Sequence, residues 1–182
     1  MNTKTKILLA AGVFVVVFLM NKEKIKKMVL NLDKWTKKRV ETLHPSLRSE
    51  VKKIFATATK ETGVVFRLTS GYRSFDEQNI LYAKGRTTKG PKVTNAVGGR
   101  SYHNYGLAFD VVPIIDGKAV WNNIDLFRKF ANVAKRYGWE WGGDWRSFKD
   151  YPHFQKTFGL TTSQLYNDLQ SNGTKYPQTL IT

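Results

Sequence analysis

The amino-acid sequence predicts an α+β fold, with helices packed against a small, mostly antiparallel sheet. Two observations support this class. Short apolar runs bounded by turn residues indicate buried strands. Longer segments with apolar residues three and four positions apart indicate amphipathic helices. With 182 residues, the chain has room for one domain of about 120 to 140 residues plus appendages.

The first half of the domain is expected to contain two helices separated by a strand. Residues 45–62 present one apolar face and are followed by a glycine, which is typical of a helix end. Residues 64–70 form an apolar, strand-like run. A second helix at 75–84 is indicated by Ser74 and Glu77, which are spaced as a capping box.

The second half of the domain is expected to complete the sheet. The apolar run at 110–115 indicates a buried strand, and the Asp-Gly pair after it predicts a hairpin turn into a short strand at 119–121. A helix is expected at 124–137, because its aromatic and alanine residues share one face. Further strands are expected around Trp139 and His153.

Two short motifs contain residues of the types that bind zinc. The first is SYHNYGLAFD at 101–110, and the second is DYPHF at 150–154. Imidazole nitrogens and carboxylate oxygens are normal zinc ligands, so we interpret His103, Asp110 and His153 as a ligand set. Three protein ligands leave one tetrahedral position free for water, which is typical of a catalytic site.

The spacing of His103 and Asp110 requires a bend in the chain between them. Residues seven apart lie about 10.5 Å apart along a helix, and on a straight strand they point to opposite faces. Gly106 supplies the conformational freedom for the bend. We therefore expect Asp110 at the end of a strand and His103 on the preceding loop.

The second motif adds an ionisable group close to the third ligand. His153 follows Pro152, which suits the start or edge of a strand. Asp150 lies three residues earlier and could take a proton from an attacking water without binding the metal. His44, the remaining histidine, is interpreted as a structural residue ahead of the first helix.

Four ordered motifs resemble a known group of zinc peptidases, which includes VanY-type D,D-carboxypeptidases and L-alanyl-D-glutamate endopeptidases. The resemblance covers roughly residues 43–159 and is stronger to the endopeptidases, which cut peptidoglycan in bacteria and in phage lysins. The motifs are SGYRS at 70–74, SYHNYGLAFD at 101–110, EWGGDW at 140–145 and DYPH at 150–153.

The resemblance implies a D-Ala-D-Ala peptidase or hedgehog-like fold with one zinc ion in a cleft. The implied ligands are His103, Asp110 and His153. It also implies that Asp150 is the general base and acid, that Arg73 faces the scissile carbonyl, and that Gln78 is a polar group on the substrate side. Ser101 is assigned to substrate binding as well. A preorganised guanidinium of this kind can stabilise the oxyanion formed when water adds to an amide.

The leading hypothesis is therefore a zinc-dependent endopeptidase that hydrolyses the L-Ala–D-Glu bond of peptidoglycan stem peptides. A D,D-carboxypeptidase that removes the terminal D-Ala could use the same metal site. A non-catalytic wall-binding module with a structural zinc is the alternative from another class, and the presence of Asp150 and Arg73 argues against it.

The N-terminal part of the chain is interpreted as a membrane attachment. Residues 7–20 are uncharged and almost wholly apolar, lysines flank them, and no small-x-small cleavage site follows. We expect a signal anchor at 1–21, a basic amphipathic linker at 22–43, the peptidase domain at 44–160 and a C-terminal tail at 161–182. The catalytic domain would act on the cell wall, although the lysines after the apolar run favour the opposite orientation.

The amino-acid composition limits which kinds of molecule the protein is expected to bind. The chain has no cysteine, so neither a disulfide nor a thiolate metal site can form. Its net charge is +16, with most of the excess in the first 60 residues. An anionic membrane or cell wall explains this charge, and because no base-reading motif is present we do not expect nucleic acid as a partner. We expect a monomer.

Overall fold

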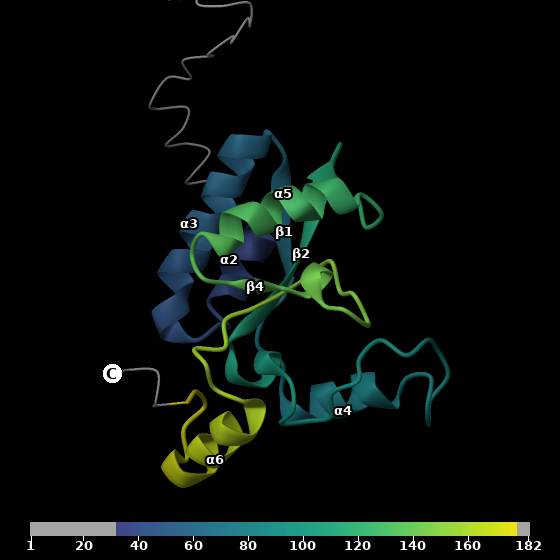
Figure 1. Ribbon diagram of the computed structural model, residues 1–182, viewed down its shortest axis with the longest axis vertical. Coiled ribbons are helices and arrows are strands. Elements are labelled where there is room, and N and C mark those ends of the chain that lie inside the picture. Colours follow the sequence, from purple (N-terminus) through teal and green to yellow (C-terminus); the bar gives the residue numbers. More distant parts are fainter. Residues whose placement is uncertain (1–31, 178–182) are drawn as a thin grey trace, which may run out of the picture.

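An antiparallel sheet forms the centre of the molecule. The computed structural model describes residues 32–177 (Figure 1). Four strands pair in the order β1 (Val65–Ser70), β2 (Ala108–Ile115), β5 (His153–Gln155) and β4 (Glu140–Trp141), and β3 (Lys118–Ala119) pairs with the end of β2. Every pairing is antiparallel. The predicted α+β class is confirmed.

Two long helices, α3 (Pro45–Thr62) and α5 (Ile124–Lys135), contact each other and the sheet. Phe130 of α5 lies at the centre of this layer and is fully buried. Its ring contacts four other aromatic rings, those of Phe55, Phe66, Phe109 and Phe154. Such pairs contribute about 0.5–1.5 kcal/mol each beyond the area they bury, so this cluster fixes how the helices lie on the strands.

Helix α2 (Lys34–Val40) covers the free edge of β1. The Thr36 hydroxyl accepts the Leu68 N–H at 3.0 Å, and the Arg39 guanidinium donates to the Leu68 carbonyl at 3.2 Å. Val40 and Leu43 are fully buried. Residues 34–43, which the sequence assigns to a linker, therefore pack on the sheet and protect a strand edge that would otherwise be open to pairing.

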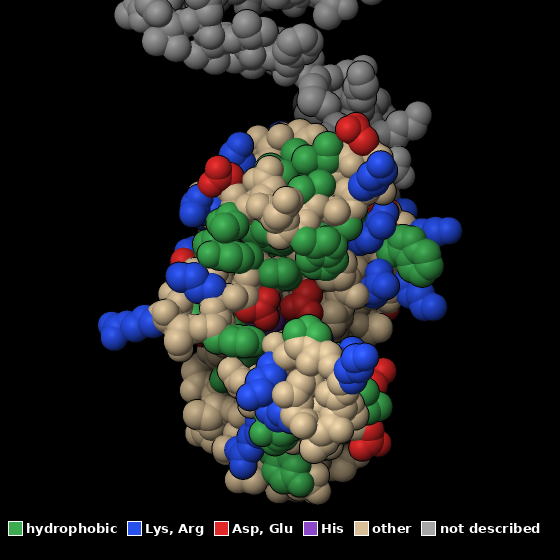
Figure 2. All heavy atoms as spheres, turned by 90° about the vertical axis from the view of Figure 1, so that its right-hand side faces the viewer, with side chains coloured by type: hydrophobic (Ala, Val, Ile, Leu, Met, Phe, Trp, Pro, Cys, Tyr) green, Lys and Arg blue, Asp and Glu red, His purple; other side chains and the backbone are tan. Residues whose placement is uncertain are grey.

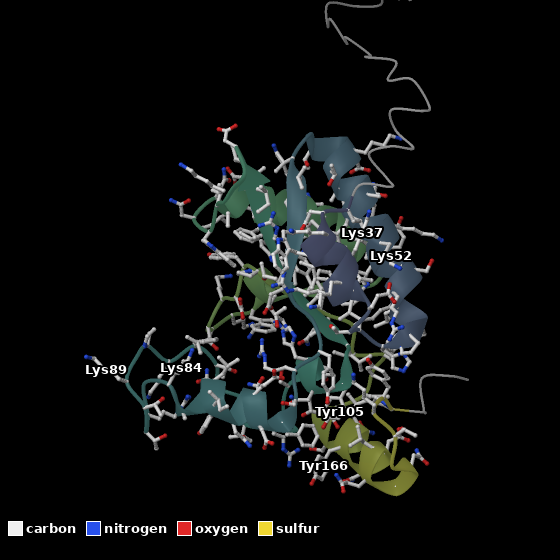
Figure 3. All side chains as sticks on the ribbon, turned by 180° about the vertical axis from the view of Figure 1, so that it is seen from behind. Lys37, Lys52, Lys84, Lys89, Tyr105 and Tyr166 are labelled. Carbon is white, nitrogen blue, oxygen red and sulfur yellow. The ribbon has the colours of Figure 1, made fainter. Side chains whose placement is uncertain are left out.

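The segment assigned to a C-terminal tail contains a helix, α6 (Thr162–Asn172). It begins with a capping box of Thr161 and Gln164, and Leu165 is fully buried. The Tyr105 hydroxyl shares its one proton between two carbonyls, that of Gly99 at 2.8 Å and that of Thr162 at 3.2 Å. Figure 3 shows Tyr105 and Tyr166 together where α6 meets the rest of the domain.

The predicted positions of the other elements agree with the structure to within a few residues. Helix α4 (Phe75–Ala83) begins with the predicted capping box, and α5 ends two residues before the expected 137. Asp116 and Gly117 have φ of 49° and 76°, as a hairpin turn of this type requires. His44 caps α3 with its ring, which is the structural role expected for it.

The expected membrane-anchored localisation is corrected. Among residues 32–177, no helix combines the length and apolar character needed to cross a bilayer. The apolar segment on which the expectation was based, at 1–21, lies outside the described residues, as does most of the linker at 22–43.

Candidate metal centre and active-site cleft

The sheet brings two of the three expected ligands together. Asp110 is the third residue of β2 and His153 the first of β5, and they are direct cross-strand partners. Such partners have Cβ atoms about 4.5–5.5 Å apart on one face. The expectation that Asp110 opens the strand was wrong by two residues, because Ala108 and Phe109 also pair with β5.

The third ligand comes from the loop before β2. His103 lies in a short 3-10 helix, η1 (Tyr102–Tyr105), which Gly106 ends with a φ of 67°. The bend predicted at Gly106 is present. A side chain at this position would collide with the backbone N of His44, so tight packing as well as the positive φ requires glycine.

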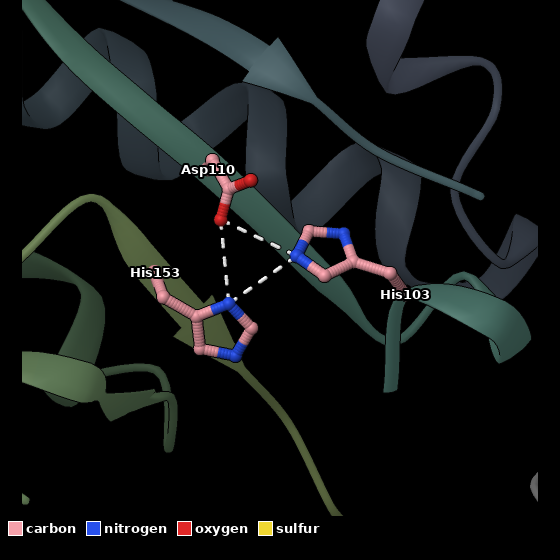
Figure 4. Close-up of side chains that lie close together, drawn as sticks. All are labelled: His103, Asp110 and His153. Atoms are coloured by element: carbon pink, nitrogen blue, oxygen red, sulfur yellow. Dashed lines mark hydrogen bonds and ion pairs between the residues drawn. The ribbon is translucent and has the colours of Figure 1, made fainter. Parts of the chain in front are cut away.

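The three candidate ligand atoms form an almost equilateral triangle (Figure 4). His103 Nε2 lies 3.2 Å from His153 Nδ1, and each nitrogen lies 3.3 Å from Asp110 Oδ1. Ligand atoms about 2.0–2.1 Å from a tetrahedral zinc ion lie about 3.3 Å from one another. The triangle therefore has the dimensions of one face of a zinc tetrahedron.

The outer nitrogen of each histidine ring faces an oxygen acceptor. His103 Nδ1 lies 2.7 Å from the Gly71 carbonyl, and His153 Nε2 lies 3.1 Å from Gln155 Oε1. A neutral ring that donates its proton outward presents a bare lone pair inward. Two imidazole lone pairs and a carboxylate oxygen then converge on one point, which is unfavourable unless a cation lies between them. The donor set fits a metal ion.

The charges of this group are strongly coupled. Burial by itself would raise the pKa of Asp110, but His103 and His153 outweigh it and hold the pKa below its ordinary value. Burial by itself would lower the pKa of His153, but its hydrogen bond to Asp110 and the charges of Asp110 and Asp150 raise it. Without a metal, the site attracts a proton to the place where a cation would lie.

Arg73 lies beside this triangle and is held from several sides. Its Nη2 is 3.6 Å from Asp110 Oδ2 and donates to the Ser70 hydroxyl at 3.0 Å. Its Nη1 donates to Gln78 Oε1 at 2.8 Å. Gln78 is fully buried, and its Nε2 donates to the Ala96 carbonyl at 2.7 Å. The structure thus places Gln78 behind Arg73 rather than on the surface of the cleft.

Asp150 lines the same cleft as the three ligands, close to His153 in the chain. Its backbone N–H donates to the Gly142 carbonyl at 3.1 Å, and its carbonyl accepts the His153 N–H at 3.2 Å. Burial and the neighbouring charge of Asp110 raise the pKa of Asp150, against the opposing effect of His153, His103 and Arg73. A carboxyl group with a raised pKa next to a metal site suits proton transfer.

Ser101 also lines the cleft, but its hydroxyl has a structural contact. It accepts the backbone N–H of His103 at 3.4 Å and so caps η1. The structure therefore places Ser101 as a support of the ligand-bearing loop and at the cleft surface at once.

The metal triangle lies in a cleft of about 800 Å³. Figure 2 shows acidic side chains at the floor of this hollow, with apolar side chains above and below it. Trp121 and Phe148 line the cleft and are 55% and 48% exposed. Lys84 also lines it, and Figure 3 shows Lys84 and Lys89 on the projecting arm that follows α4, far from Lys37 and Lys52. The sequence motifs gave no indication of Trp121 or Phe148.

A His-Asp-His triangle with two buried histidines, an acidic residue beside it and an arginine, all in one open cleft, define a metallopeptidase. A family model described as D-alanyl-D-alanine carboxypeptidase matches residues 94–156, which include all three candidate ligands. The chain is 43% identical over 122 residues to the peptidoglycan L-alanyl-D-glutamate endopeptidase CwlK of Bacillus subtilis, covering 62% of this chain and 72% of that protein. This chain belongs to the same peptidase family, as its motifs predict.

Two further relatives agree with this assignment. The L-alanyl-D-glutamate peptidase of a Listeria phage is 46% identical over 69 residues, which is 35% of this chain and 24% of the phage protein. The crystal structure of the L-Ala D-Glu endopeptidase ChiX of Serratia marcescens has 28% identity and a TM-score of 0.54, covering 69% of this chain and 88% of that one. This chain therefore shares its fold with an endopeptidase whose crystal structure has been determined.

Proposed function

We propose that this protein is a zinc-dependent endopeptidase that hydrolyses the L-Ala–D-Glu bond of peptidoglycan stem peptides, with one zinc ion per chain. The observation that carries the proposal is the triangle of His103 Nε2, His153 Nδ1 and Asp110 Oδ1, with edges of 3.2 and 3.3 Å. The choice of bond follows the three relatives described above, all of which are named for this cleavage.

A zinc ion bound by these three residues supplies a Lewis acid, which polarises the scissile carbonyl and makes a water molecule more acidic. The remaining work falls to side chains of this chain. The Asp150 carboxylate takes the proton of the attacking water and delivers it to the leaving amine. Its raised pKa brings it closer to neutral pH, where it exchanges a proton more readily in both directions.

Arg73 provides positive charge where the carbonyl oxygen becomes an oxyanion. Its guanidinium is oriented before substrate arrives, because Ser70 and Gln78 accept from its two terminal nitrogens. Preorganised charge of this kind needs no rearrangement during the reaction and is more effective in a cleft that excludes water. Gln78 acts through Arg73, since it is fully buried.

Product analysis of a defined stem peptide tests the proposed bond specificity. The full chain, loaded with zinc, is incubated with L-Ala–γ-D-Glu–meso-diaminopimelate–D-Ala–D-Ala, and the products are identified by mass spectrometry. Release of L-Ala supports the endopeptidase. Loss of a single D-Ala with the L-Ala–D-Glu bond intact would instead identify a D,D-carboxypeptidase, the activity that describes the matching family model.

A further inference from the structure

We propose that Glu140 and Gln155 form a directional hydrogen-bond chain that fixes the ring of His153 in its zinc-binding form. This inference deepens the proposed function, because it concerns the affinity of the same metal site. Both residues lie outside the metal triangle. Glu140 is in β4 and Gln155 in β5, where the two are direct cross-strand partners.

His153 faces the metal position with Nδ1, which is less often the metal-binding atom of histidine than Nε2. The position of the ring proton therefore decides whether His153 can bind. The atom facing Asp110 and His103 is Nδ1, so a neutral ring can bind a cation only if its proton is on Nε2. Gln155 Oε1 lies 3.1 Å from Nε2 and can accept that proton's hydrogen bond. The opposite tautomer would point its Nδ1 proton at the metal position.

An amide side chain alone cannot enforce this choice. The oxygen and nitrogen ends of Gln155 are nearly the same size, and a half-turn of the amide would present its NH2 group to His153. That orientation would favour the tautomer that cannot bind metal. A further contact is needed to distinguish the two orientations.

Glu140 supplies this contact. Gln155 Nε2 donates to Glu140 Oε2 at 2.8 Å, and a carboxylate can only accept. The other carboxylate oxygen, Oε1, accepts the Thr157 hydroxyl at 2.8 Å, which holds the group in place. The donors therefore run in one direction, from His153 to Gln155 and from Gln155 to Glu140.

The two histidine ligands differ in how they are held. His103 donates to the backbone carbonyl of Gly71, an acceptor that no side-chain substitution removes and that cannot be reversed. His153 depends on two side chains at the exposed end of the sheet. This makes the His153 side of the site sensitive to single substitutions.

The first test is removal of the acceptor. Gln155→Leu should weaken zinc binding by about 10- to 100-fold, the usual effect of losing such a partner. Zinc affinity is measured on the full chain by competition between Zn²⁺ and a chromogenic chelator. Gln170→Leu, the same substitution on the exposed surface of α6, is the matched control and should leave the affinity unchanged.

A second test disturbs the direction of the hydrogen-bond chain and then restores it. Glu140→Gln replaces a group that can only accept by an amide that can accept or donate, so Gln155 is no longer held in one orientation and zinc affinity should fall by about 10-fold. Combining Glu140→Gln with Gln155→Glu should restore affinity. In the double variant a carboxylate accepts from His153, the new amide donates to that carboxylate, and the net charge is unchanged.

The tautomer itself is measured without metal, by ¹⁵N NMR of the histidine rings at a pH where they are neutral. Only three histidines contribute signals. The fraction of His153 rings that carry their proton on Nε2 should be larger in the wild type than in Gln155→Leu, because only the wild type has an acceptor for that proton. Unchanged tautomer and zinc affinity within threefold of wild type in both single variants would overturn the proposal.

The outcome is separate from that of the proposed function. A protein that binds zinc through a fixed His153 but does not cleave the stem peptide would refute the endopeptidase and support the hydrogen-bond chain of Gln155 and Glu140. If the protein cleaves the peptide but substitutions of Gln155 and Glu140 leave zinc affinity unchanged, the endopeptidase is supported and the hydrogen-bond chain is refuted. Thermal unfolding of each metal-free variant identifies any loss of zinc that comes from unfolding alone.

Discussion

Replacing Asp150 by asparagine should remove catalysis while leaving the metal site intact. The substitution keeps the shape of the side chain, and the two backbone hydrogen bonds of residue 150, to Gly142 and His153, do not depend on the side chain. The carboxyl oxygens of Asp150 are not among the three convergent ligand atoms, so zinc content should stay near one per chain. What is lost is proton transfer to and from the reacting groups.

The expected size of the effect follows from that role. General acid–base catalysis contributes about 10²- to 10⁴-fold, and each tenfold is about 1.36 kcal/mol. The value of kcat/KM for Asp150→Asn should therefore fall by an amount equivalent to roughly 3–5 kcal/mol in barrier height. Cleavage is followed by chromatography of stem-peptide products, and zinc by elemental analysis of the same sample.

Asp144→Asn is the matched control for this experiment. Asp144 lies on the same segment, six residues earlier, but it is exposed and its partner is Lys135 at 2.6 Å. It should retain nearly full activity. If Asp150→Asn keeps more than a tenth of wild-type kcat/KM with its zinc in place, the assignment of Asp150 as general base and acid is wrong.

Four further outcomes are expected. His153→Ala should lower bound zinc well below one per chain by elemental analysis, and full stoichiometry would remove it from the ligand set. Arg73→Gln should lower kcat by about 100-fold with little change in KM, whereas a raised KM with an unchanged kcat would indicate a binding role. Burial raises the pKa of Asp150 in the folded chain, so its ionisation destabilises the metal-free fold as pH rises through that pKa. Metal-free Asp150→Asn should therefore unfold at a higher temperature than wild type at neutral pH, and the gap should close below the ordinary pKa of 3.8, by calorimetry. Thr36→Val leaves the Leu68 N–H without its acceptor and should cost about 1–3 kcal/mol in urea unfolding; no change would mean that α2 does not stabilise the domain.

Local patterns in the sequence were sufficient for most of the fold. Helix α3 was predicted with its observed bounds because its apolar face and terminal glycine are both local signals. The hairpin after β2 was predicted because an Asp-Gly pair favours positive φ at both positions. These features depend on neighbours in the chain and hardly at all on the tertiary structure.

Two helices with a tertiary role lie in the segments that the sequence assigns to a linker and to a C-terminal tail. Helix α2 is rich in lysine, and its buried face includes Thr36. The Thr36 hydroxyl accepts a hydrogen bond from the Leu68 N–H at the edge of β1, a role that only the folded structure shows. Helix α6 carries little apolar surface, with Leu165 as its one buried residue. Its capping box of Thr161 and Gln164 is a local signal that indicates a helix start in the sequence.

The candidate ligands could be predicted from the sequence, because histidine and aspartate are residue types that bind metal. Histidine and aspartate in two motifs indicated the ligands, and the structure brings those three side chains together. Gln155 and Glu140 were not indicated, because their importance comes from their pairing across β4 and β5 and from the direction in which an amide points. Such information is present only in three dimensions.

The C-terminal helix α6 contacts the segment that carries one of the candidate ligands. Asp110 and His153 are fixed by strand pairing, but His103 lies in η1, outside the sheet. The hydroxyl of Tyr105, in the same short helix, donates to the backbone before η1 and at the start of α6. Burial raises the pKa of Tyr105 to about 12, so this hydroxyl remains a donor at any pH at which the enzyme works. The His103 corner of the triangle, which forms two of its three edges, is therefore linked through Tyr105 to a residue 57 positions further along the chain than Tyr105.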